Sequence, residues 1–86
     1  MKIRFHRVFE KRYKKLQKSK QQKVKERLSL FLKDEFDPIL NNHPLQGKYK
    51  GYRSITITGD LRAIYKHFSG DTRIFVVLDT HSNLYK

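Results

Sequence analysis

The spacing of the apolar residues changes near the middle of this 86-residue chain, and this change constrains the fold more than any other feature. Before Pro38, most apolar residues recur every three or four positions, as they do on one face of a helix. After Pro38 they alternate with polar residues or run continuously, as they do in strands. The sequence therefore predicts an α+β fold in which the helices precede most of the strands.

The first helical stripe has i, i+4 and i+7 spacing, and it predicts a short amphipathic helix over about residues 8–17. Its members are Phe9, Tyr13 and Leu16. Residues 2–7 before it alternate polar with apolar side chains and predict a short first strand.

A second stripe predicts a longer helix over about residues 20–36, which Pro38 ends by restricting the residue before it. The stripe consists of Val24, Leu28, Phe31, Leu32 and Phe36. Ser19 is the predicted N-cap, and Gln22 three residues later would complete a capping box. The two helices would form a hairpin joined by one short turn.

Three strands are predicted after the loop at residues 37–51, which is rich in Pro, Gly and Asn. Their ranges are 52–57, 61–68 and 72–79, with tight turns between them. The last strand is apolar on both faces from Ile74 to Leu78, which predicts a central position in the sheet. The predicted order is β-α-α-β-β-β in a single domain over residues 1–86. A helical hairpin covers one face of a small, twisted, mostly antiparallel sheet, and the other face or its rim is left for function.

Charge is the strongest indication of function. The chain has 20 Lys and Arg residues against 8 acidic residues, a formal net charge of +12, and this imbalance favours contact with nucleic acid. Residues 11–27 alone hold nine basic residues and one acidic residue. Lysines at this density are typical of contacts to phosphate, so binding should weaken steeply with salt.

The segment HPLQGKYKGYRS at residues 43–54 interleaves cations with aromatic rings. Rings stack on unpaired bases while cations hold the backbone, so this composition favours single-stranded RNA. The alternative for Tyr49 or Tyr52 is that one of these rings packs into the core.

Two of the four histidines, His43 and His81, fall in predicted loops, whereas His6 and His67 fall within strand patterns. Imidazoles titrate near neutral pH, so such a pair can act as base and acid when RNA is cleaved by its own 2′-hydroxyl, with no metal or cofactor. Arg62 is the candidate for stabilising the charge that develops on the phosphate. The chain has no cysteine, no zinc-like histidine spacing, no signal peptide and no apolar membrane span, so a cytoplasmic protein is expected.

Three stretches together resemble the RelE/YafQ superfamily of toxins from type II toxin–antitoxin systems, and the YafQ branch most closely. They are HPLQGKYKGYRS (43–54), GDLRAIYK (59–66) and FVVLDTHSNLY (75–85). The resemblance implies a RelE-like fold and an mRNA interferase, a metal-independent endoribonuclease that cuts mRNA in the ribosomal A site. It also implies a 2′,3′-cyclic phosphate product and an acidic or mixed-charge antitoxin as partner.

The same resemblance implies the site residues. Those implied for catalysis are His43, Asp60, Arg62, His81 and Tyr85. Those implied for RNA binding are Lys48, Lys50, Tyr52, Arg53 and Lys66. For Asp60, the role of an ordinary turn residue is an equal alternative.

The chain departs from the family pattern at three positions. Thr56 stands where YafQ-like toxins carry a strand histidine, Leu61 where they carry an aromatic residue, and Ile55 where RelE proper has a lysine. Threonine is no base at neutral pH, so either His43 or His81 would have to take that role or activity would be reduced. Two alternatives stay open: a non-catalytic ParE-like toxin acting on DNA gyrase, and an inactive relative that binds RNA or the ribosome.

Overall fold

The computed structural model describes residues 1–84 and confirms the predicted α+β class. The elements are β1 (Lys2–Phe5), α1 (Arg7–Lys15), α2 (Lys18–Lys33), β2 (His43–Pro44), β3 (Arg53–Thr56), β4 (Leu61–Ser69), β5 (Thr72–Thr80) and α3 (His81–Leu84). Two 3₁₀ turns, Pro38–Leu40 and Gly47–Tyr49, flank β2. No helix among the described residues is both long enough and apolar enough to cross a membrane.

The five strands form one mixed sheet in the order β1-β5-β4-β3-β2. β1 runs parallel to β5, and the other neighbouring pairs are antiparallel. β5 lies between β1 and β4, so it is paired on both edges as predicted from its two-sided apolar run, although the middle strand of the five is β4. The turn between β4 and β5 contains Gly70 at φ 43°, a left-handed conformation that glycine adopts without steric cost.

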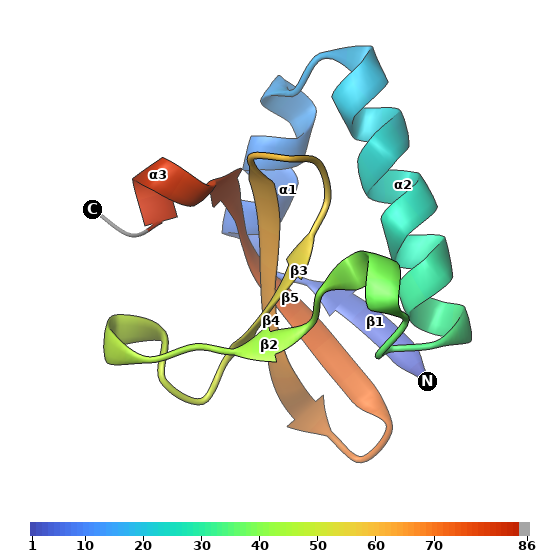
Figure 1. Cartoon of the computed structure of the whole chain (residues 1–86). Helices are drawn as coiled ribbons and strands as arrows, with labels where there is room; N and C mark the ends of the chain where they lie inside the picture. Colours follow the sequence, from blue (N-terminus) through green and yellow to red (C-terminus); the bar gives the residue numbers. More distant parts are fainter. Residues whose placement is uncertain (85–86) are drawn as a thin grey trace.

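α1 and α2 pack on one face of the sheet, as predicted (Figure 1). Their inward side chains, Phe9, Val24 and Phe31, are buried against the sheet. The Phe31 ring meets the Tyr65 and Phe75 rings edge-on, with centroids 4.9 and 5.1 Å away. These aromatic contacts, which add specific geometry to simple burial, make this face the main core.

The opposite face, here called the open face, is partly covered by a second apolar cluster. Leu45 from the loop after β2 and Leu84 from α3 pack with Ile64 of β4 and are buried with it. Partly buried side chains extend this cluster: Tyr49, Tyr52, Val76 and Val77. The central strand β4 is therefore packed on both faces.

The boundaries of α2 differ from the prediction. Gln17 is the N-cap and makes no side-chain cap, so the predicted capping box of Ser19 and Gln22 is wrong: Ser19 lies inside the helix. The helix also ends at Lys33, earlier than residue 36. Asp34 ends it, because its backbone is extended and its carboxylate accepts a hydrogen bond from the Phe36 N–H at 3.0 Å.

This early end removes part of the predicted core stripe. The side chains of Leu32 and Phe36 are 48% and 60% exposed, whereas Phe31 is fully buried. The predicted loop at 37–51 is also more ordered than expected, because His43–Pro44 forms a short strand against β3.

Replacing Phe31 with alanine should lower the free energy of unfolding by about 3–5 kcal/mol, because it leaves a cavity among buried aromatic rings. Leu32→Ala on the same helix is the matched control and should cost less than about 1 kcal/mol, since this side chain is half exposed. Urea denaturation of both variants measures the difference. Equal losses would contradict the assignment of the buried stripe.

Candidate active site at one end of the sheet

His43 lies on the open face, because it pairs with Ser54 of β3, which in turn pairs with Ile64 of β4. Its ring Nδ1 is 2.8 Å from the carbonyl oxygen of Asn41. A carbonyl can only accept, so Nδ1 carries the proton and donates it. In the neutral ring, the lone pair is then on Nε2, which is the atom available as a base.

Asn41 achieves this contact through an unusual backbone. Its φ is 46°, and among residues 1–84 it is the one non-glycine residue with positive φ. Asparagine tolerates the left-handed region better than most residues. This conformation ends the Pro38–Leu40 turn and directs the chain into β2, which carries His43.

His81 and Asp60 are brought together through the backbone. The N–H of His81 donates to the carbonyl oxygen of Asp60 at 2.8 Å, which joins the start of α3 to the turn between β3 and β4. The Asp79 carboxylate reinforces the start of α3 by accepting from the Thr80 N–H at 2.8 Å and from the Asn83 side chain at 3.1 Å. The two predicted site residues are therefore neighbours in space.

Arg62 reaches the same turn. It pairs with Thr56 across β3 and β4 and therefore shares the open face with it. One guanidinium nitrogen, Nη1, donates to the carbonyl oxygens of Thr58, Gly59 and Leu61 at 2.9–3.2 Å. A permanently charged group is thus held next to Asp60 and the start of α3.

The second apolar cluster positions both histidine-bearing segments. Leu45 follows His43 by two residues, Leu84 follows His81 by three, and both leucines pack on Ile64. His43 and His81 are therefore both anchored to β4 through Ile64. Ile64 is two residues from Arg62 in the same strand. The structure brings Asp60, Arg62 and His81 to one turn, whereas His43 shares only the anchoring strand with them. The fifth predicted catalytic residue, Tyr85, lies outside the described residues.

Most of the predicted RNA-binding residues also share the open face. The Lys66 ammonium lies over the Tyr52 ring at 5.2 Å, and Lys48 lies over the Tyr49 ring at the same distance. The two tyrosines meet edge-on, with centroids 6.1 Å apart. Both rings are half-buried, so each packs on the second cluster with part of its surface accessible. Lys50 is exposed in the loop next to them.

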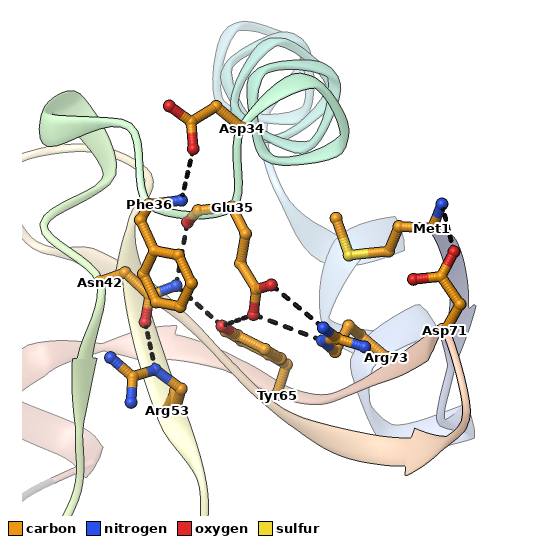
Figure 2. A network of polar contacts seen from close by, with 9 residues as sticks. All are labelled: Met1, Asp34, Glu35, Phe36, Asn42, Arg53, Tyr65, Asp71 and Arg73. Carbon is orange, nitrogen blue, oxygen red and sulfur yellow. Dashed lines mark hydrogen bonds and ion pairs between the residues drawn. The ribbon is translucent and has the colours of Figure 1, made fainter.

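Arg53 lies elsewhere. It pairs with Tyr65 and therefore faces the helices. Its Nε donates to the Asn42 side-chain oxygen at 2.7 Å, and its guanidinium lies 5.3 Å from the centre of the Phe36 ring. Figure 2 shows these contacts as part of a polar network behind the open face. The Arg53 side chain therefore lies on the opposite face of the sheet from those of Tyr52 and Lys66.

The centre of this network is Glu35, just after α2. Its carboxylate accepts from the Tyr65 hydroxyl at 2.6 Å and from two nitrogens of Arg73 at 3.2 and 3.3 Å (Figure 2). Burial raises the pKa of Glu35, but the hydrogen bonds from Tyr65 and Arg73 outweigh it and leave the pKa below its ordinary value. Burial and the bond to Glu35 raise the pKa of Tyr65 to about 12.

The network also fixes the loop that carries His43. The Asn42 side-chain nitrogen donates to the Glu35 carbonyl oxygen at 3.0 Å and to the Tyr65 hydroxyl at 2.8 Å. Sequence reasoning missed these residues. One signal was available: Arg73 falls two positions before Phe75 on the core-facing side of β5, and a charged group there requires a partner.

Comparison with known proteins agrees with the fold. The family model of the YafQ bacterial toxins of type II toxin–antitoxin systems matches residues 1–86. No curated protein matches the chain.

Solved structures share the fold over nearly the whole chain. The crystal structure of YafQ from E. coli strain BL21(DE3) is 27% identical, with a TM-score of 0.80, covering 98% of this chain and 97% of that chain. The toxin in the E. coli DinJ–YafQ toxin–antitoxin complex is 28% identical, with a TM-score of 0.77, covering 98% and 96%. The YoeB–YefM complex from Staphylococcus aureus, at 20% identity, a TM-score of 0.76 and coverage of 94% and 97%, shows likeness of fold alone.

The low pKa of Glu35 predicts acid sensitivity. A lowered pKa contributes stability above the ordinary value of 4.5, and this contribution is lost as the pH falls through the lowered pKa. Glu35→Gln should therefore reduce the fall in unfolding free energy between about pH 6 and pH 3. Tyr65→Phe should also reduce it, whereas Tyr13→Phe on α1 should not. Identical pH profiles for wild type and Glu35→Gln would refute this role.

Ser54 is a position at which a substitution is predicted to stabilise the protein. Its hydroxyl is fully buried and has no hydrogen-bond partner among the described residues. Ser54→Ala should raise the free energy of unfolding by about 1 kcal/mol. It removes a hydroxyl that gives up its hydrogen bonds to water when the protein folds. Ser69→Ala, at the exposed end of β4, is the control and should change it by less than about 0.5 kcal/mol. A clear loss of stability in Ser54→Ala, measured by urea denaturation, would reveal a partner for this hydroxyl.

Proposed function

The chain belongs to the YafQ family of bacterial type II toxins, and on this basis we propose that it is a ribosome-dependent mRNA interferase. One observation carries the proposal: the His81 N–H is hydrogen-bonded to Asp60 at the same turn whose carbonyl oxygens hold the Arg62 guanidinium, at one end of the sheet. A proton-transfer group next to a fixed cation is what cleavage of RNA by its own 2′-hydroxyl requires.

In the proposed reaction, a base removes the proton of the 2′-hydroxyl, and the 2′-oxygen attacks the adjacent phosphorus. The bond from phosphorus to the 5′-oxygen breaks, and an acid protonates that oxygen. The products are a 2′,3′-cyclic phosphate and a 5′-hydroxyl. No metal or cofactor enters this scheme.

We assign the acid and base roles to His81 and His43. The Nδ1–H···O contact with Asn41 presents the His43 Nε2 lone pair, which suits a base or a phosphate contact. Arg62 stabilises the charge on the phosphate, and the Asp60 carbonyl positions His81. Tyr85 enters only through the family resemblance, as a residue that stacks on or orients the mRNA. Thr56, beside Arg62, supplies no base.

The substrate is proposed to lie on the open face, with Lys48, Lys50, Tyr52 and Lys66 contacting RNA. We assign Arg53 to support of the His43 loop, because it is bonded to Asn42 on the other side of the sheet. The ribosome supplies the mRNA in the cytoplasm, and residues 1–86 act as one toxin domain. The proposed regulatory partner is an antitoxin with enough acidic residues to offset a net charge of +12.

Purified protein added to programmed ribosomes tests the proposal. Mapping of mRNA ends should find cuts in the A-site codon, carrying a cyclic phosphate. His81→Ala should slow cleavage by about 10²-fold or more, because it removes a proton-transfer group. His67→Ala is the matched control: this exposed histidine is in β4 and outside the site, so cleavage should be unchanged.

Two outcomes would contradict the proposal. Ribosome binding without any cut ends would indicate an inactive relative, and inhibition of DNA gyrase in place of cleavage would indicate a ParE-like toxin. Equal loss of activity in His81→Ala and His67→Ala would remove His81 from its assigned role.

A further inference from the structure

The open face continues beyond the candidate active site as a groove of about 480 Å³. Tyr49, Tyr52 and Lys66 line one part of it, and Phe68, at the far end of β4, lines another. Its floor is apolar and comes from β5: Ile74, Val76 and Val77. The described residues that line the groove include cations and aromatic rings but no acidic side chain.

Phe68 has no role in the core. The residue is 51% exposed and belongs to neither buried apolar cluster. The Arg4 guanidinium of β1 lies 5.0 Å from its ring centre. This pair repeats the arrangement of Lys66 over Tyr52 and of Lys48 over Tyr49. Three pairs of an aromatic ring and a cation therefore lie along the same face.

The strand register makes these pairs continuous with the site. Arg4, Ile74 and Lys66 pair across β1, β5 and β4 and form one row. Phe68 follows Lys66 by two residues, at an irregularity in the register between His67 and Ser69, and it lines the same groove as Lys66. Tyr52, which contacts Lys66, is two residues from Ser54 in the row of His43. The path thus leads from His43 through Tyr52 and Lys66 to Phe68.

Rings paired with cations suit single-stranded RNA. Each cation covers a ring face in the free protein, and RNA can exchange this contact for two others. A base stacks on the ring while the released cation pairs with a phosphate. Stacking of this kind accepts any base and needs no base-edge hydrogen bonds, which agrees with an apolar floor.

From these observations we infer that the Phe68 ring and the Arg4 guanidinium form a second binding platform for single-stranded RNA, on the same face as the candidate active site and beyond it. The inference rests on the proposed function for the identity of the ligand. The bound strand comes either from the mRNA next to the cut codon or from ribosomal RNA, and the two sources present the same chemistry.

Equilibrium binding to a 12-nucleotide single-stranded RNA with 2′-O-methyl sugars, which cannot be cleaved, tests the platform. Phe68→Ala should weaken binding about tenfold, the effect of losing one stacked base, without changing the salt dependence. Arg4→Gln should weaken it and reduce the slope of log affinity against log salt by about 0.7–1, the value for one phosphate contact. Phe36→Ala is the matched control, because Phe36 is also exposed and paired with an arginine, but on the helix side. It should change affinity less than twofold.

The two sources are separated on the ribosome. A photo-crosslinking phenylalanine derivative at position 68 should form an adduct with mRNA or with ribosomal RNA, and sequencing of the adduct identifies which. Adducts with ribosomal protein alone would overturn the inference. Unchanged RNA affinity in Phe68→Ala, with weakened binding of an antitoxin, would also overturn it and make the groove a protein-binding surface.

Failure of this inference is distinguishable from failure of the proposed function. The binding assay involves no cleavage, so the platform can be confirmed even if wild-type protein cuts no mRNA. Conversely, cleavage that depends on His81, together with RNA affinity unaffected by Phe68→Ala, would refute the platform and leave the interferase proposal standing.

Discussion

The hydrogen bond between the Tyr65 hydroxyl and the Glu35 carboxylate joins the core to the rest of the molecule. The Tyr65 ring is buried with Phe31 and Phe75, so its hydroxyl must find a partner inside the protein. Glu35 accepts it, and the negative charge is balanced by Arg73. The end of α2 is thereby attached to β4 and β5, through residues 30 and 38 positions after Glu35.

The same hydroxyl accepts a hydrogen bond from Asn42. The Tyr65 hydroxyl oxygen thus connects the core aromatic cluster with the loop that carries His43. The two are separated in the sheet by β3, which lies between β4 and β2. A histidine on an unsupported loop would sample many orientations, whereas this one is preceded by a residue with its side chain fully engaged. The positioning of the candidate site is therefore a consequence of satisfying buried polar groups.

The two faces of the sheet differ in role: the helix face contributes most to stability, and the open face carries the residues assigned to function. Of the buried apolar residues in the described part of the chain, most lie on the helix face, and a smaller cluster around Ile64 lies on the open face. That cluster anchors β2 and α3, which carry the two histidines, and leaves a basic, aromatic groove beside it. A net charge of +12 is costly for a compact chain, so a surface of this kind is best explained by a polyanion or an acidic partner that neutralises it.

The amino-acid sequence by itself determined the fold class, the two helices and the three later strands, because apolar periodicity is a local property that each segment expresses alone. It also indicated His43, Arg62 and His81 through residue type and family resemblance. Only the tertiary structure decided the end of α2, the short strand β2 and the placement of Arg53 behind the open face. These features depend on contacts between segments far apart in the chain, such as Arg53 with Asn42 and Glu35 with Arg73, and no local pattern encodes such pairings.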